Sequence, residues 1–293
     1  MNILITGSTG FVGSALLRHI NESDSKDNVF LLSSQKSEHY PTFLYQRNDS
    51  GFLYKAPENI DVLIHLGSWT PKSTAVANDV EKSFSNILFT YSLLSKMRGL
   101  KKVIFVSTID VYAPTTEVID ENSTVNPISL YGSSKVYCEE MVKAWADESS
   151  IPCCILRLGH IYGVGEFQYK KLIPILIGQA LKNEPINIFS DGREKRSFLD
   201  VENCAMVIWK AAHDDSIGVF NVTSGHSCSV IDIAQKIKVL AGSKSDIVVH
   251  HKYLNTRDCV FDNSKLLEQF HIKEKTLDDG LREEIEYFRT LEA

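Results

Sequence analysis

The chain has 293 residues, of which 43% are hydrophobic and 23% charged, so it can bury the core of one large domain or two modest ones. Its formal net charge of −6 argues against general affinity for nucleic acids or anionic membranes, because neither would be attracted overall. No apolar run reaches the ~18 residues that span a bilayer, and no leader precedes the first predicted strand. We therefore expect a cytoplasmic protein with no nucleic-acid or membrane partner. The six cysteines are scattered without a Cys-x-x-Cys pair, which favours free thiols over a metal site.

A glycine-rich turn follows the first predicted strand, residues 3–6, and precedes a helical pattern that continues to residue 20. Gly7 permits a tight turn, Gly10 lets the backbone approach a pyrophosphate, and Gly13 lets the helix pack closely on the strand. The free N–H groups and partial positive charge of a helix N-terminus suit phosphate. The pattern predicts a dinucleotide site in preference to a turn that serves packing alone, with contacts from Gly7, Thr9, Gly10, Phe11, Val12 and Gly13.

The second predicted strand, residues 29–32, is followed by Ser33-Ser34-Gln35-Lys36. A dinucleotide domain that selects NAD usually has an acidic residue here for the adenosine ribose. Its absence removes a repulsion of a 2′-phosphate, which the serines could hydrogen-bond and Lys36 or Arg18 could neutralise. This favours NADP(H) over NAD(H). The alternative is that Ser33 and Ser34 are loop residues and the cofactor is NAD. A third strand is predicted at 43–45, and beyond it Asp49 lies where adenine could be held.

Two further predicted strands deliver small polar residues to one edge of the sheet. The apolar run 61–67 ends in Gly67-Ser68, whose small size lets backbone run alongside a cofactor. After a predicted helix at 79–97, the strand at 103–106 leads into Ser107-Thr108. Open parallel sheets bind their ligands at the carboxyl ends of strands. A hydroxyl there could hydrogen-bond a substrate carbonyl, although a strand-end Ser-Thr is often only a turn.

Tyr131 and Lys135 open the next predicted helix, and their spacing of four places them on one face, one turn apart. A free tyrosine has a pKa of about 10, and a nearby cation lowers it. The pair therefore predicts a proton shuttle at Tyr131, assisted by Lys135. Because Tyr-x-x-x-Lys is common, the interpretation depends on the strands and turn around it.

The strand at 152–158 completes a series of apolar strands that alternate with helices, which predicts a parallel sheet covered on both faces. Glycines at 159–165 indicate a boundary. We expect a dinucleotide-binding domain at 1–165 and a mainly substrate-binding domain at 166–293, with residues near 200–224 returning to the first. Within the second part, helices are predicted at 167–182, 229–240 and 279–291, a polar turn at 191–196 and a strand at 219–222.

The order and spacing of these motifs resemble the extended short-chain dehydrogenase/reductase family, in particular its nucleotide-sugar epimerase/dehydratase/reductase branch. The resemblance covers essentially the whole chain. It is carried by Thr6-Gly7-x-x-Gly10-Phe11-x-Gly13, Asp61-x-x-x-His65-Leu66, Asn86, Ser107-Thr108 with Val111-Tyr112, Tyr131-Gly132-x-Ser134-Lys135, Leu156-Arg157 with Ile161-Tyr162-Gly163, Asp191-Gly192 with Arg196-x-Phe198, Phe220-Asn221-Val222 and Asp262-x-Ser264-Lys265.

The resemblance implies an α/β fold, a Rossmann-type doubly wound parallel sheet with a smaller C-terminal substrate-binding domain. It implies that Tyr131 is the general acid/base, that Lys135 binds the nicotinamide ribose, and that Thr108 polarises the reacting C–O group beside Ser107. Further cofactor contacts are implied for Leu66, Gly67, Ser68 and Asn86, and substrate contacts for Arg196, Arg257 and His160. The implied partners are a nucleoside-diphosphate sugar and a second copy of the chain.

Three departures from the family pattern shape the functional hypothesis. Ile109-Asp110 stands where 4,6-dehydratases carry Asp-Glu, His160 replaces an Asn, and the acidic ribose clamp is absent. Water elimination needs both an acid and a base, so the missing carboxylate argues against dehydration. The sequence therefore favours a reductase of a nucleotide-linked 4-keto-6-deoxy sugar, with Tyr131 as proton donor. The alternative is a nucleotide-sugar 4-epimerase with tightly held NAD, and a third hypothesis is a dinucleotide-binding sensor without turnover.

Overall fold

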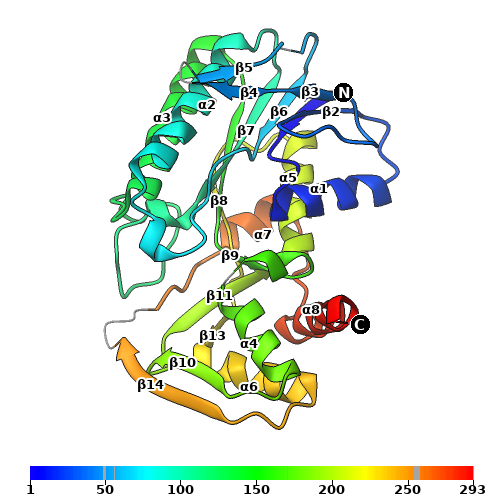
Figure 1. The fold of residues 1–293 in the computed structure, drawn as a ribbon. Coiled ribbons are helices and arrows are strands. Elements are labelled where there is room, and N and C mark those ends of the chain that lie inside the picture. Colours follow the sequence, from blue (N-terminus) through cyan, green and yellow to red (C-terminus); the bar gives the residue numbers. More distant parts are fainter. Residues whose placement is uncertain (49–50, 56, 170, 254–257, 293) are drawn as a thin grey trace. The chain divides into compact units, whose positions relative to one another are not determined.

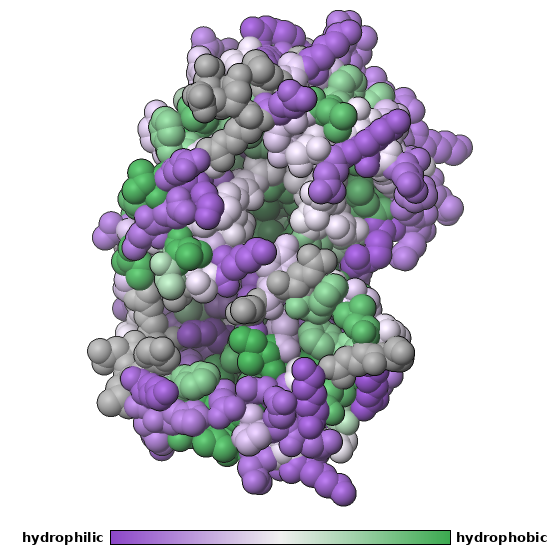
Figure 2. Space-filling model, in the orientation of Figure 1, coloured by the Kyte–Doolittle hydropathy of each residue, from purple (hydrophilic) through white to green (hydrophobic). Residues whose placement is uncertain are grey.

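The computed structural model describes residues 1–48, 51–55, 57–169, 171–253 and 258–292 (Figure 1). It contains two compact units. The first comprises Met1–Pro114, Ser123–Leu158 and Cys204–Phe220, and the second comprises Thr115–Asn122, Gly159–Asn203 and Asn221–Ala293. No helix in the described ranges is long and apolar enough to cross a membrane. Hydrophilic side chains cover much of the face drawn in Figure 2, and hydrophobic ones gather in smaller groups.

A seven-stranded sheet organises the first unit, in the order β12-β8-β7-β6-β1-β2-β3. Every pairing from β8 to β3 is parallel. The central strands are buried on both faces, which explains their continuous apolar sequence. The strands are β1 Asn2–Thr6, β2 Asn28–Ser33, β3 Thr42–Leu44, β6 Val62–His65, β7 Lys102–Thr108, β8 Cys153–Leu158 and β12 Gly218–Val222.

Helices cover both faces of this sheet, with α2 and α3 on one face and α1 and α5 on the other (Figure 1). The predicted α/β doubly wound fold is therefore confirmed. The helices are α1 Phe11–Glu22, α2 Val80–Lys96, α3 Leu130–Ser149 and α5 Val201–His213. Short 3-10 turns occur at η1 Thr74–Val76 and η2 Ile109–Val111, and an antiparallel hairpin joins β4 Gln46–Asn48 to β5 Gly51–Leu53.

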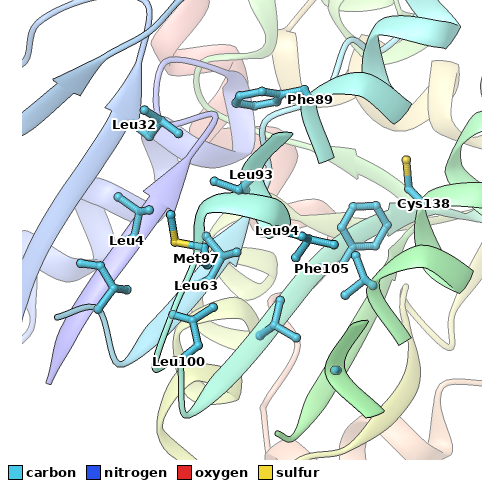
Figure 3. Close-up of a cluster of buried hydrophobic side chains, with 14 of the residues drawn as sticks. Leu4, Leu32, Leu63, Phe89, Leu93, Leu94, Met97, Leu100, Phe105 and Cys138 are labelled. Atoms are coloured by element: carbon cyan, nitrogen blue, oxygen red, sulfur yellow. The ribbon is translucent and has the colours of Figure 1, made fainter. Parts of the chain in front are cut away.

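A hydrophobic core lies between the sheet and the helices α2 and α3. Leu93 of α2 and Met97, which follows the end of α2, belong to one buried cluster with Leu4 and Leu63 of the sheet and with Phe105 of β7 (Figure 3). Each of these side chains is nearly inaccessible to solvent. Fully burying a side chain of this size stabilises a fold by roughly 1.5–3 kcal/mol, so the strand ends that carry the polar residues have little freedom to move.

The second unit contains two small sheets and four helices. Its three-stranded sheet has β11 Lys195–Asp200 between β9 His160–Tyr162, which runs parallel to it, and β13 Ser227–Ser229, which runs antiparallel. The other sheet pairs β10 Ile186–Ser190 with β14 Ile247–Tyr253 in parallel. The helices are α4 Leu172–Leu181, α6 Val230–Ala241, α7 Ser264–Phe270 and α8 Leu277–Glu292, and η3 Glu166–Gln168 precedes α4. Their core includes Leu176, Ile177, Ile233, Ile237, Leu281 and Ile285.

Several elements of the C-terminal half differ from the sequence-based prediction, which also named no element at β9, β10, β13 or α7. The helix expected from 167 begins only at Leu172, after η3. The polar turn expected to extend to 196 ends earlier, because Lys195 already starts β11. Helix α5 was not predicted, although its less buried residues Glu202, Met206, Lys210 and His213 recur at steps of three or four along one side.

Candidate functional site

The glycine turn after β1 has a shape that only glycines permit. Gly7 has a φ of 75°, and a Cβ there would lie 2.7 Å from the Gly67 nitrogen. A Cβ at Gly13 would lie 2.1 Å from the Gly7 carbonyl oxygen. Both contacts are with backbone atoms, which cannot move away by a change of side-chain rotamer. These two glycines therefore bring the start of α1, the end of β1 and the loop after β6 into direct backbone contact.

The N-terminus of α1 fits a phosphate group. Gly10 is the N-cap residue and makes no side-chain cap hydrogen bond. A Cβ on Gly10 would meet only the Gly7 oxygen, at 3.4 Å, so a neighbouring molecule could approach its backbone closely. The hydroxyl of Ser8 is buried and has no hydrogen-bond partner in the described structure. Thr9 is exposed, while Phe11 and Val12 are half-buried. A buried donor and an uncapped helix end match the pyrophosphate of a dinucleotide.

The residues expected to select the adenosine ribose lie at the end of β2. Ser33 is buried, and its hydroxyl accepts a hydrogen bond from the Gln35 amide at 3.1 Å. Ser34 and Lys36 are exposed. The Ser33 oxygen thus stabilises its own turn, and the accessible polar groups at this strand end are Ser34, Gln35 and Lys36. Asp49 lies outside the described residues.

A buried hydrogen-bond chain fixes the loop after β6. The Gly67 amide donates to the Thr6 hydroxyl at 2.8 Å, and that hydroxyl lies 2.7 Å from Nδ1 of His65. Nε2 of His65 lies 3.1 Å from the hydroxyl of Thr90, which donates to the Asn86 carbonyl. Burial and the nearby Lys135 ammonium lower the pKa of His65 to about 3. His65 is therefore a neutral core residue that connects the loop to α2.

Asn86, expected to contact the cofactor, uses its amide to hold the same loop. Its Oδ1 accepts from the Trp69 amide at 2.7 Å, and its Nδ2 donates to the Trp69 carbonyl at 3.1 Å. This two-point contact fixes Trp69, whose ring meets the Tyr131 ring edge-on with centroids 6.0 Å apart. Leu66, Gly67 and Ser68 line the preceding part of the loop and are half-buried.

Three hydroxyl groups converge at the start of α3. Tyr131, which is 4% exposed, has side-chain hydrogen bonds with Thr108 at the end of β7 and with Thr70 in the loop after β6. Ser129 caps the helix by accepting from the Gly132 amide at 3.1 Å, which fixes where the helix begins. The strand-end hydroxyl and the phenol expected from the sequence therefore meet, and Thr70 is a partner that the sequence analysis missed.

Lys135 lies one turn further along α3 and is 2% exposed. Its ammonium donates to the Val106 carbonyl at 2.7 Å and to the Ser68 hydroxyl at 3.0 Å. Burial lowers its pKa to about 8, and Cys138 and Glu139 oppose this decrease.

The expected lowering of the Tyr131 pKa is wrong for the protein by itself. Burial raises the pKa of Tyr131 to about 12, the two threonine hydrogen bonds lower it, and the Asp110 carboxylate raises it. Removal of the ring from water costs the phenolate more than its hydrogen bonds return. The phenol thus holds its proton at neutral pH until a further positive group lies beside it.

Ser107 faces the interior of the first unit. Its hydroxyl donates to Oε1 of Glu139 at 2.5 Å, and Glu139 also receives two hydrogen bonds from Arg157. The hydroxyl of Ser107 is thereby occupied by a buried carboxylate, whereas that of Thr108 faces the phenol. The sequence analysis assigned no role to Glu139. Its spacing of four after Lys135 was the available signal, because it places the carboxylate on the same helical face.

The expected substrate residues of the second unit are His160, Arg196 and Arg257. His160 starts β9, and its ring lies 5.5 Å from that of Phe198 in β11. Burial, Arg196 and Lys171 lower the pKa of His160 to about 4, so its ring is neutral at pH 7. Nδ1 of His160 is buried without a hydrogen-bond partner among the described atoms. Arg257 lies outside the described residues. No group of three or more His, Cys, Asp or Glu in the described ranges could hold a metal ion.

Comparison with known proteins places this geometry in a family. The family model "NAD dependent epimerase/dehydratase family" matches residues 3–223. The chain belongs to this family. The match includes the glycine turn, the loop after β6, the end of β7 and the start of α3, and it confirms the family resemblance drawn from the motifs.

Curated relatives of this family member include both dehydratases and epimerases. The trifunctional UDP-glucose 4,6-dehydratase/UDP-4-keto-6-deoxy-D-glucose 3,5-epimerase/UDP-4-keto-L-rhamnose-reductase RHM2 of Arabidopsis thaliana is 30% identical over 313 residues, which cover 98% of this chain and 47% of that protein. The chain thus spans about half the length of this plant relative. The dTDP-glucose 4,6-dehydratase of Haemophilus influenzae is 27% identical, with 98% of both chains covered.

Solved structures of similar fold include 4-epimerases. The UDP-glucose 4-epimerase of Thermotoga maritima with UDP-glucose has a TM-score of 0.87 at 24% identity, with 100% of both chains covered. The UDP-glucuronic acid 4-epimerase of Bacillus cereus, in complex with UDP-glucuronic acid and NAD, has a TM-score of 0.84 at 24% identity, with coverage of 99% of this chain and 100% of that one. These likenesses establish the same fold over the entire chain.

Proposed function

We propose that the chain is a nucleotide-sugar 4-epimerase that retains its nicotinamide cofactor through the catalytic cycle. The observation that carries this proposal is the Tyr131 hydroxyl, which hydrogen-bonds Thr108 one helical turn before the buried ammonium of Lys135. The full-length likeness to epimerase structures supports it further. This proposal replaces the reductase favoured by the sequence, because the similar solved structures are 4-epimerases, whereas the plant relative names a reductase as one of three activities of a protein about twice as long as this chain.

The residues of the first unit can move one proton in both directions. In the proposed cycle Tyr131 Oη takes the proton of the sugar C4 hydroxyl as the C4 hydride departs, and returns it when hydride comes back to the other face. A bound nicotinamide supplies the acceptor and later donor of that hydride. Thr108 hydrogen-bonds the C4 oxygen and stabilises the charge that develops on it. Because Tyr131 holds its proton in the protein by itself, its role as base would require the positive charge of the bound cofactor to lower its pKa.

The residues after Thr108 support epimerisation over dehydration. Ile109 is an aliphatic side chain where elimination would need an acid for the leaving hydroxyl, and Asp110 is the single carboxylate of this segment. Burial raises the pKa of Asp110. One carboxyl group cannot serve at the same time as acid for the leaving hydroxyl and base for the neighbouring C–H. We therefore do not propose dehydratase activity for this chain, although several relatives are named dehydratases.

A second candidate function is reduction of a nucleotide-linked 4-keto sugar with NADP(H). The end of β2 favours it, because the accessible groups there are Ser34, Gln35 and Lys36, and no carboxylate lies among these residues. A reductase exchanges its cofactor in every turnover, whereas an epimerase retains it. The same Tyr131, Thr108 and Lys135 would serve both reactions.

The deciding experiment measures what happens to the cofactor. Purified protein is denatured, and any released nucleotide is identified as NAD or NADP by chromatography. Intact protein is then incubated with CDP-, GDP-, dTDP- and UDP-sugars, and separately, with added NADPH, with their 4-keto-6-deoxy forms. Epimerisation interconverts two sugars with no net change in the absorbance of reduced nicotinamide, while reduction consumes NADPH in proportion to product. No turnover on any sugar, with dinucleotide binding retained, would favour the sensor hypothesis.

We also propose that the chain forms a homodimer through α2 and α3. Four apolar side chains on these helices are more than half exposed, and they are Val80, Phe84, Tyr91 and Tyr137. Exposed apolar groups gathered on neighbouring helices are typical of an interface between subunits. Light scattering should report a dimer for the natural chain and a monomer for Phe84→Glu combined with Tyr91→Glu. A monomeric natural chain would contradict the proposal.

A further inference from the structure

A buried carboxylate lies directly behind the proposed catalytic residues. Glu139 of α3 is 1% exposed and accepts three hydrogen bonds. Its Oε1 receives the Ser107 hydroxyl at 2.5 Å and Nε of Arg157 at 3.0 Å, and its Oε2 receives Nη2 of Arg157 at 2.6 Å. Two-point binding of a carboxylate by a guanidinium is both strong and geometrically specific. Glu139 therefore has one defined orientation.

These contacts fix the rotation of α3 against two strands. Ser107 immediately precedes Thr108 in β7, and Arg157 lies in β8 with its guanidinium 4.8 Å from the centre of the Tyr112 ring. Glu139 follows Lys135 by one turn, so both side chains are on one helical face. A rotation of α3 that displaced Tyr131 from Thr108 would also break the hydrogen bonds of Glu139. The carboxylate of Glu139 thus fixes the rotation of α3, the helix that carries Tyr131 and Lys135.

The same carboxylate is the nearby negative group for two buried cations. Lys135 contacts the neutral oxygens of Val106 and Ser68, and its ammonium lies 4.2 Å from the centre of the Phe105 ring. The titratable groups that influence it are Cys138 and Glu139 on α3, which raise its pKa. His65 on β6 also faces it, and burial keeps that ring neutral. Glu139 therefore interacts with both cations, because it raises the pKa of Lys135 and accepts two hydrogen bonds from Arg157.

We propose that Glu139 is a positioning residue, which fixes the rotation of α3 and divides one negative charge between Lys135 and Arg157. Its importance for turnover rests on the proposed function, whereas its effect on Lys135 does not. If Lys135 and Arg157 share the charge of Glu139, the two substitutions should shift the Lys135 pKa in opposite directions. Loss of the Glu139 charge leaves two uncompensated cations and favours a neutral lysine. Loss of Arg157 frees the whole charge of Glu139 for Lys135 and favours the ammonium. A purely structural role of Glu139 does not predict pKa shifts of opposite sign in the two variants.

The test is a titration of Lys135 by carbon NMR in protein labelled at lysine Cε, with the signal assigned by its absence in Lys135→Met. We expect a pKa of about 8 in the natural chain. In Glu139→Gln it should fall by about one unit or more, and in Arg157→Met it should rise by a similar amount. Glu140→Gln, an exposed neighbour on α3 that pairs with Lys143, is the matched control and should leave the titration unchanged. Shifts of one sign in both variants, or no shift, would overturn the proposal.

Removal of one member of a buried ion pair strongly destabilises a protein because the other charge is left uncompensated, so either variant could fail to fold. In that case the remaining one decides, because each has its own expected sign. Arg157→Gln, which keeps a polar side chain, replaces Arg157→Met if that variant is insoluble.

Activity gives a second and separate measurement. The alkaline limb of the kcat/KM profile should move with the Lys135 pKa, downward in Glu139→Gln and upward in Arg157→Met. NMR shifts of opposite sign without turnover on any nucleotide sugar would support the role of Glu139 and refute the proposed function. Turnover without NMR shifts would do the reverse, so the two proposals can fail independently.

Discussion

Glu284 provides a quantitative test of the C-terminal core. It lies in α8, is 0% exposed, and neither of its carboxylate oxygens has a hydrogen-bond partner within the described structure. Burial, followed by the charges of Glu166 and Asp200, raises the pKa of Glu284 from 4.5 to about 9, and Lys171 partly opposes this. The folded protein therefore keeps this group protonated at neutral pH, while the unfolded chain ionises it.

The magnitude follows from linkage. Between pH 4.5 and about 9 the folded state holds a proton that the unfolded state has released, so stability falls as pH rises through this range. Each pH unit costs about 1.4 kcal/mol, which amounts to about 3 kcal/mol at pH 7 and about 4 kcal/mol between pH 5 and pH 8. In Glu284→Gln this loss disappears, because the amide does not ionise. Its stability relative to the natural chain should therefore increase by about 1.4 kcal/mol per pH unit.

Urea unfolding of both proteins at several pH values between 5 and 8 measures this slope. The slope matters rather than the absolute difference, because the buried amide adds an offset that does not vary with pH. Glu286→Gln on the same helix is the matched control. Its side chain is 67% exposed and pairs with Arg289, so its curve should run parallel to that of the natural chain. Parallel curves for Glu284→Gln would show that this carboxyl group ionises freely in the fold, and would refute the reasoning.

Three further predictions concern the candidate site. Tyr131→Phe should lower turnover by roughly 10²–10⁴-fold, because a positioned acid/base is lost, while dinucleotide binding by calorimetry persists; unchanged turnover would remove Tyr131 from the mechanism. Gly13→Ala should abolish dinucleotide binding, because its Cβ would lie 2.1 Å from the Gly7 oxygen; normal affinity would contradict the geometry of the turn. Thr70→Val deletes a hydrogen bond that lowers the Tyr131 pKa, so the limb of the pH–rate profile that reports phenolate formation should move to higher pH. An unshifted limb would show that Thr70 does not influence the phenol.

The parts of the fold that the sequence predicted well are those with strong local signals. Continuous apolar runs bounded by glycines indicated the central strands, because a parallel strand is buried on both faces. The glycine turn was also recognisable from the sequence. Gly7 and Gly13 make close backbone contacts that a residue with a Cβ does not allow. Helix α5 was missed although it carried a periodic signal. Its polar residues Glu202, Lys210 and His213 lie on one less buried side at helical spacing, and the other sides are buried.

The candidate site was only partly predictable. The spacing of Tyr131 and Lys135 is a property of one helix, so their common face followed from the sequence. The approach of Thr70 depends on the loop after β6, which Asn86 and the chain through His65 hold from another element. Asn86 was expected to contact a cofactor. Its amide instead binds the backbone of Trp69, a contact that no sequence pattern specifies.

The sequence alone determined the chemical groups available here, their family pattern and their order along the chain. Tertiary structure decided the state of those groups, because a pKa depends on solvent and charges contributed by distant segments. Burial keeps the phenol of Tyr131 protonated, and the hydrogen-bond partners of Glu139 come from β7 and β8. Periodicity reports which face of a helix is apolar, but it cannot report which charge that face will meet.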